Sequence, residues 1–362
     1  MKQNELITIF IPTHNRPSYL KRILAYYSEY QVACNMIVTD SSPDEIKKVN
    51  GETVLSFSNL KVQHINYPTE INPFLKIADA VERVNTKYCV FCADDDFVTP
   101  NGINQSVDFL ENNTDFSVAH GRYISFHLED NERGEQQFCW KHAYSRESIT
   151  FSDPKDRLSY HLSSYLIPTF YAVHRTEHLK MIYEETRKTG LIKISPLSEL
   201  VRSMLSLIYG KMQCLDVLYA ARDEDSTRLV DWPDLTDAIK TGAYDEEYAK
   251  VRDLLSIHLS QQTQRDIKES MKLIDDAMSA YVKKYYFSSS KMASLTTNMG
   301  HTLDHLRLPD WLDGGIRGMY KRLFALGSIK RDNVEPSLSL EVNDDLNMIR
   351  HYVLGSSRVM TK

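Results

Sequence analysis

The chain of 362 residues is 42% hydrophobic and 25% charged, with a net charge of −6 and a pI near 6.1. These values are typical of a globular protein with a large core, and the acidic balance argues against a nucleic-acid-binding protein, which needs a basic surface to meet phosphates. No apolar run reaches the roughly 18 residues of a membrane-spanning helix, and the N-terminus lacks the apolar segment of a signal peptide, so we expect a cytoplasmic protein.

The first third of the chain alternates predicted strands with predicted helices. Apolar, β-branched runs at residues 6–11, 34–39, 60–66 and 88–92 predict strands, and the segments between them predict helices. This alternation predicts an α/β fold of Rossmann-like type, with a mostly parallel sheet and helices on both faces.

Polar side chains follow three of these strands at the point where each strand ends. The carboxyl ends of parallel strands meet at one edge of a sheet, where open α/β sheets bind their ligands. We therefore expect these side chains to lie close together. They are Thr13, Asn15 and Arg16 after the first strand, Asp40 after the second, and Asp94, Asp95 and Asp96 after the fourth.

The run of three aspartates predicts a cation site. Adjacent carboxylates repel one another and are tolerated best beside a compensating positive charge. The alternative is an acidic turn whose last aspartate caps the next helix, and Asp40 has a similar alternative as a helix cap or Asx-turn. The glycine-rich motifs of dinucleotide-binding enzymes and P-loop NTPases do not occur. A nucleotide diphosphate bound here would therefore need a metal ion.

Two cysteines within the fourth strand-like run, Cys89 and Cys92, have the C-x-x-C spacing of zinc and redox sites. Residues three apart on a strand point to opposite faces, so we predict that both pack in the core. The five cysteines of the chain are odd in number and scattered, which is typical of reduced thiols.

Residues 9–17, Asp40 and the acidic run 94–96 resemble the N-terminal half of family 2 glycosyltransferases, which have the GT-A fold. The resemblance is clear over residues 5–125 and loose over 126–230. It implies that the loop after the first strand and the acid after the second hold the nucleoside, through Thr13, Asn15, Arg16 and Asp40. It also implies that the Asp-rich segment binds the ribose and the divalent cation on the sugar-nucleotide diphosphate.

The resemblance also divides the three aspartates. The family pattern is Asp-x-Asp-Asp followed by a proline, and counting back from Pro100 places Ala93 at its first position. Asp95 then stands at the ligand position for Mn²⁺ or Mg²⁺, with Asp96 beside it at the metal and Asp94 near the ribose. Because Ala93 departs from the pattern, the division of labour among the aspartates stays open.

A predicted helix over residues 195–210 carries Glu199 in its first turn. Helix electrostatics or a capping box would explain an acid there. The resemblance implies instead that the catalytic base stands at the start of such a helix, which makes Glu199 the first candidate and Asp225, with the two acids before it, the alternative. Arg222 is predicted to reach the diphosphate, and Lys76 is a second candidate for that role.

The stretch between the aspartates and this helix is less regular. Residues 116–123 predict a strand, 128–150 an exposed insertion or hairpin, 157–166 a helix and 169–174 a strand. His161 and His174, which fall in the last two, are expected to be packing or surface histidines rather than catalysts.

The chain becomes helical from about residue 232, which predicts a GT-A catalytic domain over 1–230 and a helical domain over 231–362. Residues 311–331 form a basic, amphipathic segment led by a tryptophan, which suits an anionic membrane surface. The alternative is a helix that packs on the catalytic domain or at a homodimer interface.

The resemblance as a whole implies a metal-dependent, inverting glycosyltransferase. Its donor would be a nucleotide-diphosphate sugar, a UDP-sugar first of all, and its acceptor a hydroxyl of a glycan or lipid-linked glycan in bacterial surface-polysaccharide synthesis. We expect a cytoplasmic protein that can sit on the inner face of the membrane. The alternatives are a non-catalytic scaffold subunit that binds nucleotide sugars and a nucleotidyltransferase, which would carry a glycine-rich loop after the first strand.

Overall fold

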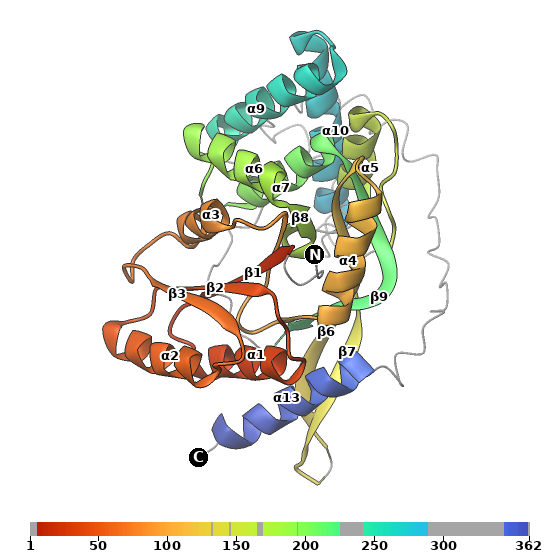
Figure 1. Ribbon diagram of the computed structural model, residues 1–362. Helices are drawn as coiled ribbons and strands as arrows, with labels where there is room; N and C mark the ends of the chain where they lie inside the picture. Colours follow the sequence, from red (N-terminus) through yellow and green to blue (C-terminus); the bar gives the residue numbers. More distant parts are fainter. Residues whose placement is uncertain are drawn as a thin grey trace.

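The computed structural model describes residues 6–131, 133–144, 146–164, 169–193, 195–224, 242–288 and 344–360. Figure 1 shows a twisted sheet with helices on both faces: α1 and α2 cover one face of the N-terminal strands, and α3, α6 and α7 lie across the other.

The strands are β1 (Ile7–Thr13), β2 (Asn35–Asp40), β3 (Lys61–Asn66), β4 (Tyr88–Phe91), β5 (Phe97–Val98), β6 (Phe116–Asp130), β7 (Gln136–Ala143), β8 (Val173–Arg175) and β9 (Lys211–Asp223). The helices are α1 (Pro17–Glu29), α2 (Asp44–Ser56), α3 (Pro73–Arg83), α4 (Pro100–Asn112), α5 (Pro154–Ser164), α6 (Thr176–Lys188), α7 (Pro196–Tyr209), α9 (Asp245–Thr263), α10 (Ile267–Ser288) and α13 (Asp344–Met360), with the short 3₁₀ helix η2 (Thr169–Tyr171).

The strands form one mixed sheet in the order β3-β2-β1-β4-β8-β6-β9-β5, and β7 pairs with β6. The first four strands of this order run parallel, and the register places Thr13 beside Asp40. Strand β8 is antiparallel to both of its neighbours. The predicted α/β class is thus confirmed, with antiparallel strands joined to the parallel half.

Local sequence explains where these elements begin. Six of the seven residues of β1 are buried, as expected of a central strand with helices on both faces. Helices α1, α3, α4 and α7 each begin with proline, whose fixed backbone angle suits the first helical position. The Asn72 side chain accepts a hydrogen bond from the Phe74 amide at the start of α3, and Thr99 accepts one from the Gly102 amide at the start of α4.

The middle of the chain differs in detail from the expectations. The strand predicted at 116–123 continues to Asp130 and forms, with β7, the hairpin expected within 128–150. The strand predicted at 169–174 is divided into η2 and β8. Its first residues form the 3₁₀ turn, and the buried Tyr171 side chain there donates a hydrogen bond to Asp96.

The C-terminal helices pack on the α/β part through one continuous apolar core. Leu254 of α9, Ile274 of α10 and Ile349 of α13 are buried in the same cluster as the strands. The predicted boundary at 230/231 and the basic segment 311–331 lie outside the described residues, so the two-domain division stays a prediction. Within the described part of the chain, no helix combines the length and apolarity needed to cross a membrane.

The structure confirms the packing roles predicted for two cysteines and two histidines. Cys89 and Cys92 are buried free thiols. His161 and His174 are buried as well, and burial lowers the pKa of each imidazole from 6.5 to about 4.

The buried imidazole of His161 should make the fold sensitive to acid. Since the unfolded chain accepts a proton near pH 6.5 and the folded protein resists it until about pH 4, the stability that His161 contributes is complete above pH 6.5 and is lost as the pH falls. We expect the His161→Gln variant to unfold at a lower temperature than the parent at neutral pH and to lose this deficit on acidification. The exposed His351→Gln variant serves as control. A deficit that stays constant with pH would contradict the prediction.

Candidate active site

Asp94 lies at the carboxyl end of β4, in a hydrogen-bonded group that joins three strand ends. Its carboxylate accepts a hydrogen bond from Thr13 Oγ1 at 2.6 Å. Lys76 Nζ, from α3, donates to the Thr13 carbonyl and to Ser41 Oγ, both at 2.8 Å. Burial and the neighbouring charge of Asp95 raise the pKa of Asp94 to about 7, and burial lowers the pKa of Lys76 to about 8.

Asp95 faces two arginines from the start of the chain. Its Oδ2 contacts Arg16 Nη1 at 2.5 Å, and its backbone carbonyl accepts a hydrogen bond from Arg22 Nη2 at 2.6 Å. Both guanidinium groups lie against the Tyr19 ring, 5.5 and 4.7 Å from its centroid. Arg22 and Tyr19 belong to α1, so this helix as well as the loop before it carries the charges that face the carboxylates.

Asp96 turns to a different set of partners. Its carboxylate accepts hydrogen bonds from the Tyr171 hydroxyl, from the Asp223 amide at 2.9 Å and from Arg222 Nε at 3.3 Å. Burial raises the pKa of Asp96 to about 6, and the charge of Arg222 opposes that rise. Arg222 Nη1 also contacts the Tyr144 hydroxyl at 2.5 Å. Asp96 therefore joins the acidic run to the end of β9.

Asp40 is fully buried and already hydrogen-bonded through both oxygens. It accepts from the Ser42 amide at 2.8 Å, from Asn50 at 2.7 Å and from the His64 ring at 3.1 Å. Burial would raise the pKa of Asp40, but these hydrogen bonds outweigh it and hold the pKa below the ordinary range. Ser42 in turn accepts from the amide of Asn15, which has a left-handed backbone conformation with φ 56°. Asp40 thus shapes the loop that carries Asn15.

Most of the side chains predicted for the site therefore lie at one edge of the sheet. Hydrogen bonds and ion pairs connect Thr13, Arg16, Lys76, Asp94 and Asp95 into one group. The expectation that the strand ends converge is confirmed.

Glu199 stands apart from this group, in the first turn of α7. Ser195 caps the helix by accepting a hydrogen bond from the Ser198 amide at 3.1 Å, so the helix start has its cap without Glu199. Glu199 lines a pocket with Phe170 and Arg202. Phe170 and Tyr171 both belong to η2, so this short helix connects the surroundings of Glu199 to Asp96.

Arg202 brings a buried positive charge to the same pocket. Its guanidinium lies 4.5 Å from the centroid of the Phe74 ring, and it is 4% exposed. Among the described residues, Nε and Nη2 of Arg202 have no hydrogen-bond partner. The pocket thus holds a carboxyl group, from Glu199, and a guanidinium group, from Arg202, one helical turn apart on α7.

The far end of α7 is held by Arg157 of α5, so Arg157→Met should destabilise the helix that carries Glu199. Arg157 donates to the carbonyls of Leu207 at 2.6 Å and Ile208 at 3.0 Å. Because these buried acceptors would lose a charged donor at the negative end of the helix dipole, we expect a loss of about 3 kcal/mol in urea unfolding. The half-exposed Lys155→Met, on the same helix, should cost far less, and equal losses would contradict the prediction.

The acidic run fits a hard divalent cation. It offers carboxylate oxygens, the ligands that Mg²⁺ and Mn²⁺ prefer. The Asp96 carboxylate is occupied by protein donors, whereas that of Asp95 faces the guanidinium of Arg16. Arg16 thereby supplies the positive charge beside Asp95.

Sequence reasoning missed several contributors. Tyr171, Asp223 and Arg22 all bind the acidic run, and Tyr144 contacts Arg222. A basic residue on the first helix, facing the strand end, was a usable signal for Arg22. The alternative base Asp225 lies outside the described residues.

Comparison with known proteins gives a family match and distant structural likenesses. Residues 8–178 match the family model described as Glycosyl transferase family 2. The match bears out the predicted GT-A fold. No match was found among curated proteins.

Three solved structures illustrate the structural likenesses. The crystal structure of S. aureus TarS 1-349 is 11% identical, with a TM-score of 0.49, over 82% of this chain and 76% of that one. The same fragment in complex with UDP is 12% identical, with a TM-score of 0.47 and the same coverage. The mannosyltransferase PcManGT from Pyrobaculum calidifontis, in complex with GDP-Man and Mn²⁺, is 10% identical, with a TM-score of 0.39, over 81% of this chain and 78% of that one.

Proposed function

Because residues 8–178 belong to glycosyl transferase family 2, we propose that this glycosyltransferase uses a divalent cation and a nucleotide-diphosphate sugar, and that it inverts the anomeric centre. The observation that carries the proposal is the meeting of the aspartates 94–96 with Arg16, Arg22, Lys76 and Arg222 at one sheet edge. A diphosphate with its metal ion needs both kinds of charge in one place.

The nucleoside and diphosphate would bind along the ends of β1, β2 and β4. Thr13 ends β1, Asn15 and Arg16 lie in the loop after it, and Asp40 fixes that loop through Ser42. Asp94 would face the ribose. Arg222 and Lys76 would add positive charge as the diphosphate leaves.

Asp95 would hold Mn²⁺ or Mg²⁺, which neutralises charge on the departing diphosphate when it is bound. Asp96, predicted as a second ligand, is better suited to support: its three protein donors fix the chain on which Asp95 sits. Arg16 would release Asp95 and turn to a phosphate oxygen.

Glu199 would act as the general base. It would take the proton of the acceptor hydroxyl while that oxygen attacks the anomeric carbon from the face opposite the diphosphate, and a single displacement of this kind inverts the configuration. The position of Glu199 beside η2, next to the partner of Asp96, supports this role.

We further propose a UDP-sugar as donor and a glycan or lipid-linked glycan hydroxyl as acceptor. A cytoplasmic enzyme with the basic segment 311–331 suits an acceptor at the inner face of a membrane, as in surface-polysaccharide synthesis. These finer assignments rest on the sequence resemblance.

Thermal stabilisation by a panel of nucleotides and sugar nucleotides, with and without Mn²⁺, tests the donor class first. A true donor at about 100 times its dissociation constant should add roughly 2.7 kcal/mol of stability. Sugar release from that donor, dependent on the metal, then tests catalysis. Binding without turnover towards any acceptor would favour a scaffold subunit, and stabilisation by no sugar nucleotide would overturn the proposal.

A further inference from the structure

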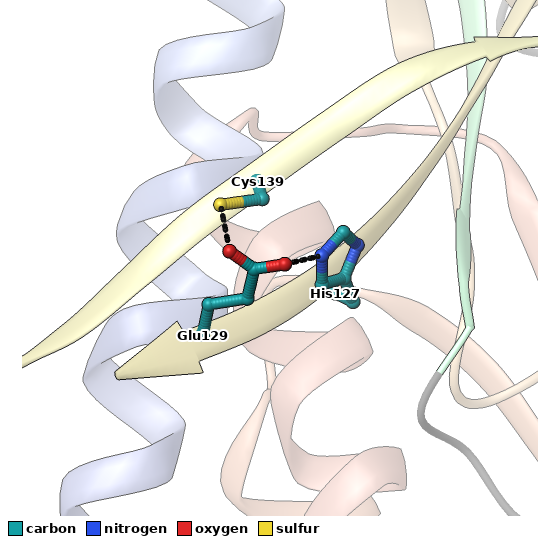
Figure 2. Close-up of side chains that lie close together, drawn as sticks. All are labelled: His127, Glu129 and Cys139. Carbon is teal, nitrogen blue, oxygen red and sulfur yellow. Dashed lines mark hydrogen bonds and ion pairs between the residues drawn. The ribbon is translucent and has the colours of Figure 1, made fainter. Parts of the chain in front are cut away.

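A group of side chains of the types that ligate metals lies on the β6–β7 hairpin and includes none of the aspartates 94–96. His127 and Glu129 are two residues apart on β6 and so share one face of the ribbon. Cys139 of β7 is the direct register partner of His127. Figure 2 shows that the three residues bring an imidazole nitrogen, a carboxylate oxygen and a thiol sulfur close together.

The three side chains already point toward one another. The Glu129 carboxylate lies between the other two: one oxygen is 2.7 Å from His127 Nε2 and the other 3.6 Å from Cys139 Sγ (Figure 2). One ligand atom from each residue lies within 4.8 Å of the others. Tetrahedral zinc ligands stand roughly 3.4 to 3.6 Å apart, given the usual bond lengths. Rotations of these side chains would suffice to enclose an ion, because the backbone register already brings them together.

We propose that His127, Glu129 and Cys139 bind Zn²⁺. A thiolate together with an imidazole selects zinc over the hard cations, which prefer oxygen alone. The thiolate and the carboxylate would balance the two charges of the ion. Three protein ligands leave a fourth position for water or a further carboxylate.

Glu224, just after β9, is placed to orient the histidine. Its carboxylate lies 3.7 Å from His127 Nδ1, the nitrogen that faces away from Glu129, and Lys141 holds it at 2.9 Å. Zinc-bound histidines commonly give their second ring nitrogen to a carboxylate, which fixes the ring. His127 Nδ1 is buried and, within the described part of the chain, lacks a hydrogen-bond partner.

A metal here would act on the hairpin and not on the transfer chemistry directly. The ribbon packs beside α13 (Figure 1), and β7 ends one residue before Tyr144, whose hydroxyl contacts Arg222. An ion that joins β6 to β7 would make the hairpin more rigid, and with it the position of Tyr144 against Arg222. The zinc site is argued from the hairpin residues alone, and its effect on the proposed glycosyl transfer would be indirect, through the contact between Tyr144 and Arg222.

Co²⁺ titration of the untagged, full-length, reduced protein tests the proposal. Co²⁺ coordinated by a thiolate gives a charge-transfer absorption that oxygen ligands do not give, so the acidic run cannot imitate it. We expect this absorption at one equivalent of Co²⁺, its displacement by one equivalent of Zn²⁺, and no displacement by excess Mg²⁺. Cys139→Ser should abolish it, and Glu129→Gln and His127→Gln should each weaken Zn²⁺ binding at least tenfold.

Cys214→Ser supplies the matched control, since Cys214 is also partly exposed but lies on β9 outside the cluster. It should retain the absorption. Thermal unfolding without metal checks that each variant folds, and Zn²⁺ should raise the unfolding temperature of the parent but not of Cys139→Ser. A parent without the thiolate absorption, or a Cys139→Ser protein that keeps it, would overturn the proposal.

Discussion

Replacing Glu199 with glutamine is expected to lower kcat for sugar transfer by about 10²- to 10⁴-fold, the range typical of a lost general base. Glutamine keeps the size of the side chain but cannot accept the hydroxyl proton. KM for the donor should change little, because the contacts proposed for the donor lie at the ends of β1, β2 and β4 and not on α7. Steady-state kinetics with the donor found by stabilisation would measure both parameters.

The exposed Glu184→Gln on α6 is the control for Glu199→Gln, because its carboxylate pairs with Lys188 at the surface. It should leave kcat unchanged. Asp225→Asn tests the alternative base. If that variant loses far more activity than Glu199→Gln, the role of base passes to Asp225.

Asp95→Asn is expected to remove the stabilisation that Mn²⁺ gives in the presence of donor and to lower transfer by about a hundredfold or more. The physical reason is the loss of the carboxylate proposed to bind the cation, while the shape of the loop is kept. Thermal unfolding with and without Mn²⁺ and an activity assay over a metal titration would measure the two effects.

Two further aspartates sharpen this test. Asp44→Asn, at the exposed start of α2, should behave as the parent. Asp96→Asn should lower the unfolding temperature of the protein, because Asp96 accepts hydrogen bonds from Tyr171, Arg222 and the Asp223 amide. The affinity of this variant for Mn²⁺ should change little. Full Mn²⁺ stabilisation of Asp95→Asn would show that the ion binds elsewhere.

The converging edge of the sheet could be predicted because it depends on local patterns. Apolar runs that stop at polar residues locate strand ends, and parallel pairing brings such ends together. The acidic run, Thr13 and Arg16 were therefore visible in the sequence. The start of α7 was visible too, through Pro196, although the cap by Ser195 was not predicted.

The remaining parts depend on contacts between distant segments. Tyr171 and Asp223 are separated from Asp96 by 75 and 127 residues. Tyr171 lies in η2, and Asp223 ends β9, which pairs in parallel with β6 through register shifts. A tyrosine in a single 3₁₀ turn carries no periodic signal. The hydrogen bonds from Asn50 and His64 to the Asp40 carboxylate could not be predicted for the same reason, since they depend on how α2 and β3 pack.

The hairpin cluster illustrates a different limit. Residues 128–150 are charged and lack the alternation of a half-buried strand, so the pairing of β6 with β7 could not be assigned residue by residue. Only the register places Cys139 opposite His127.

The ion pair between Arg16 and Asp95 has a consequence for how the affinities for cation and donor depend on each other. A cation that arrives alone must displace a guanidinium from the carboxylate, and a donor that arrives alone meets an arginine already engaged. Under the proposed function, the diphosphate would offer Arg16 a new partner and the cation would take the place of Arg16 beside Asp95, so each ligand should raise the affinity for the other by the same factor. Because Asp95 is already paired with Arg16, the site should bind cation and donor together more tightly than it binds either one alone.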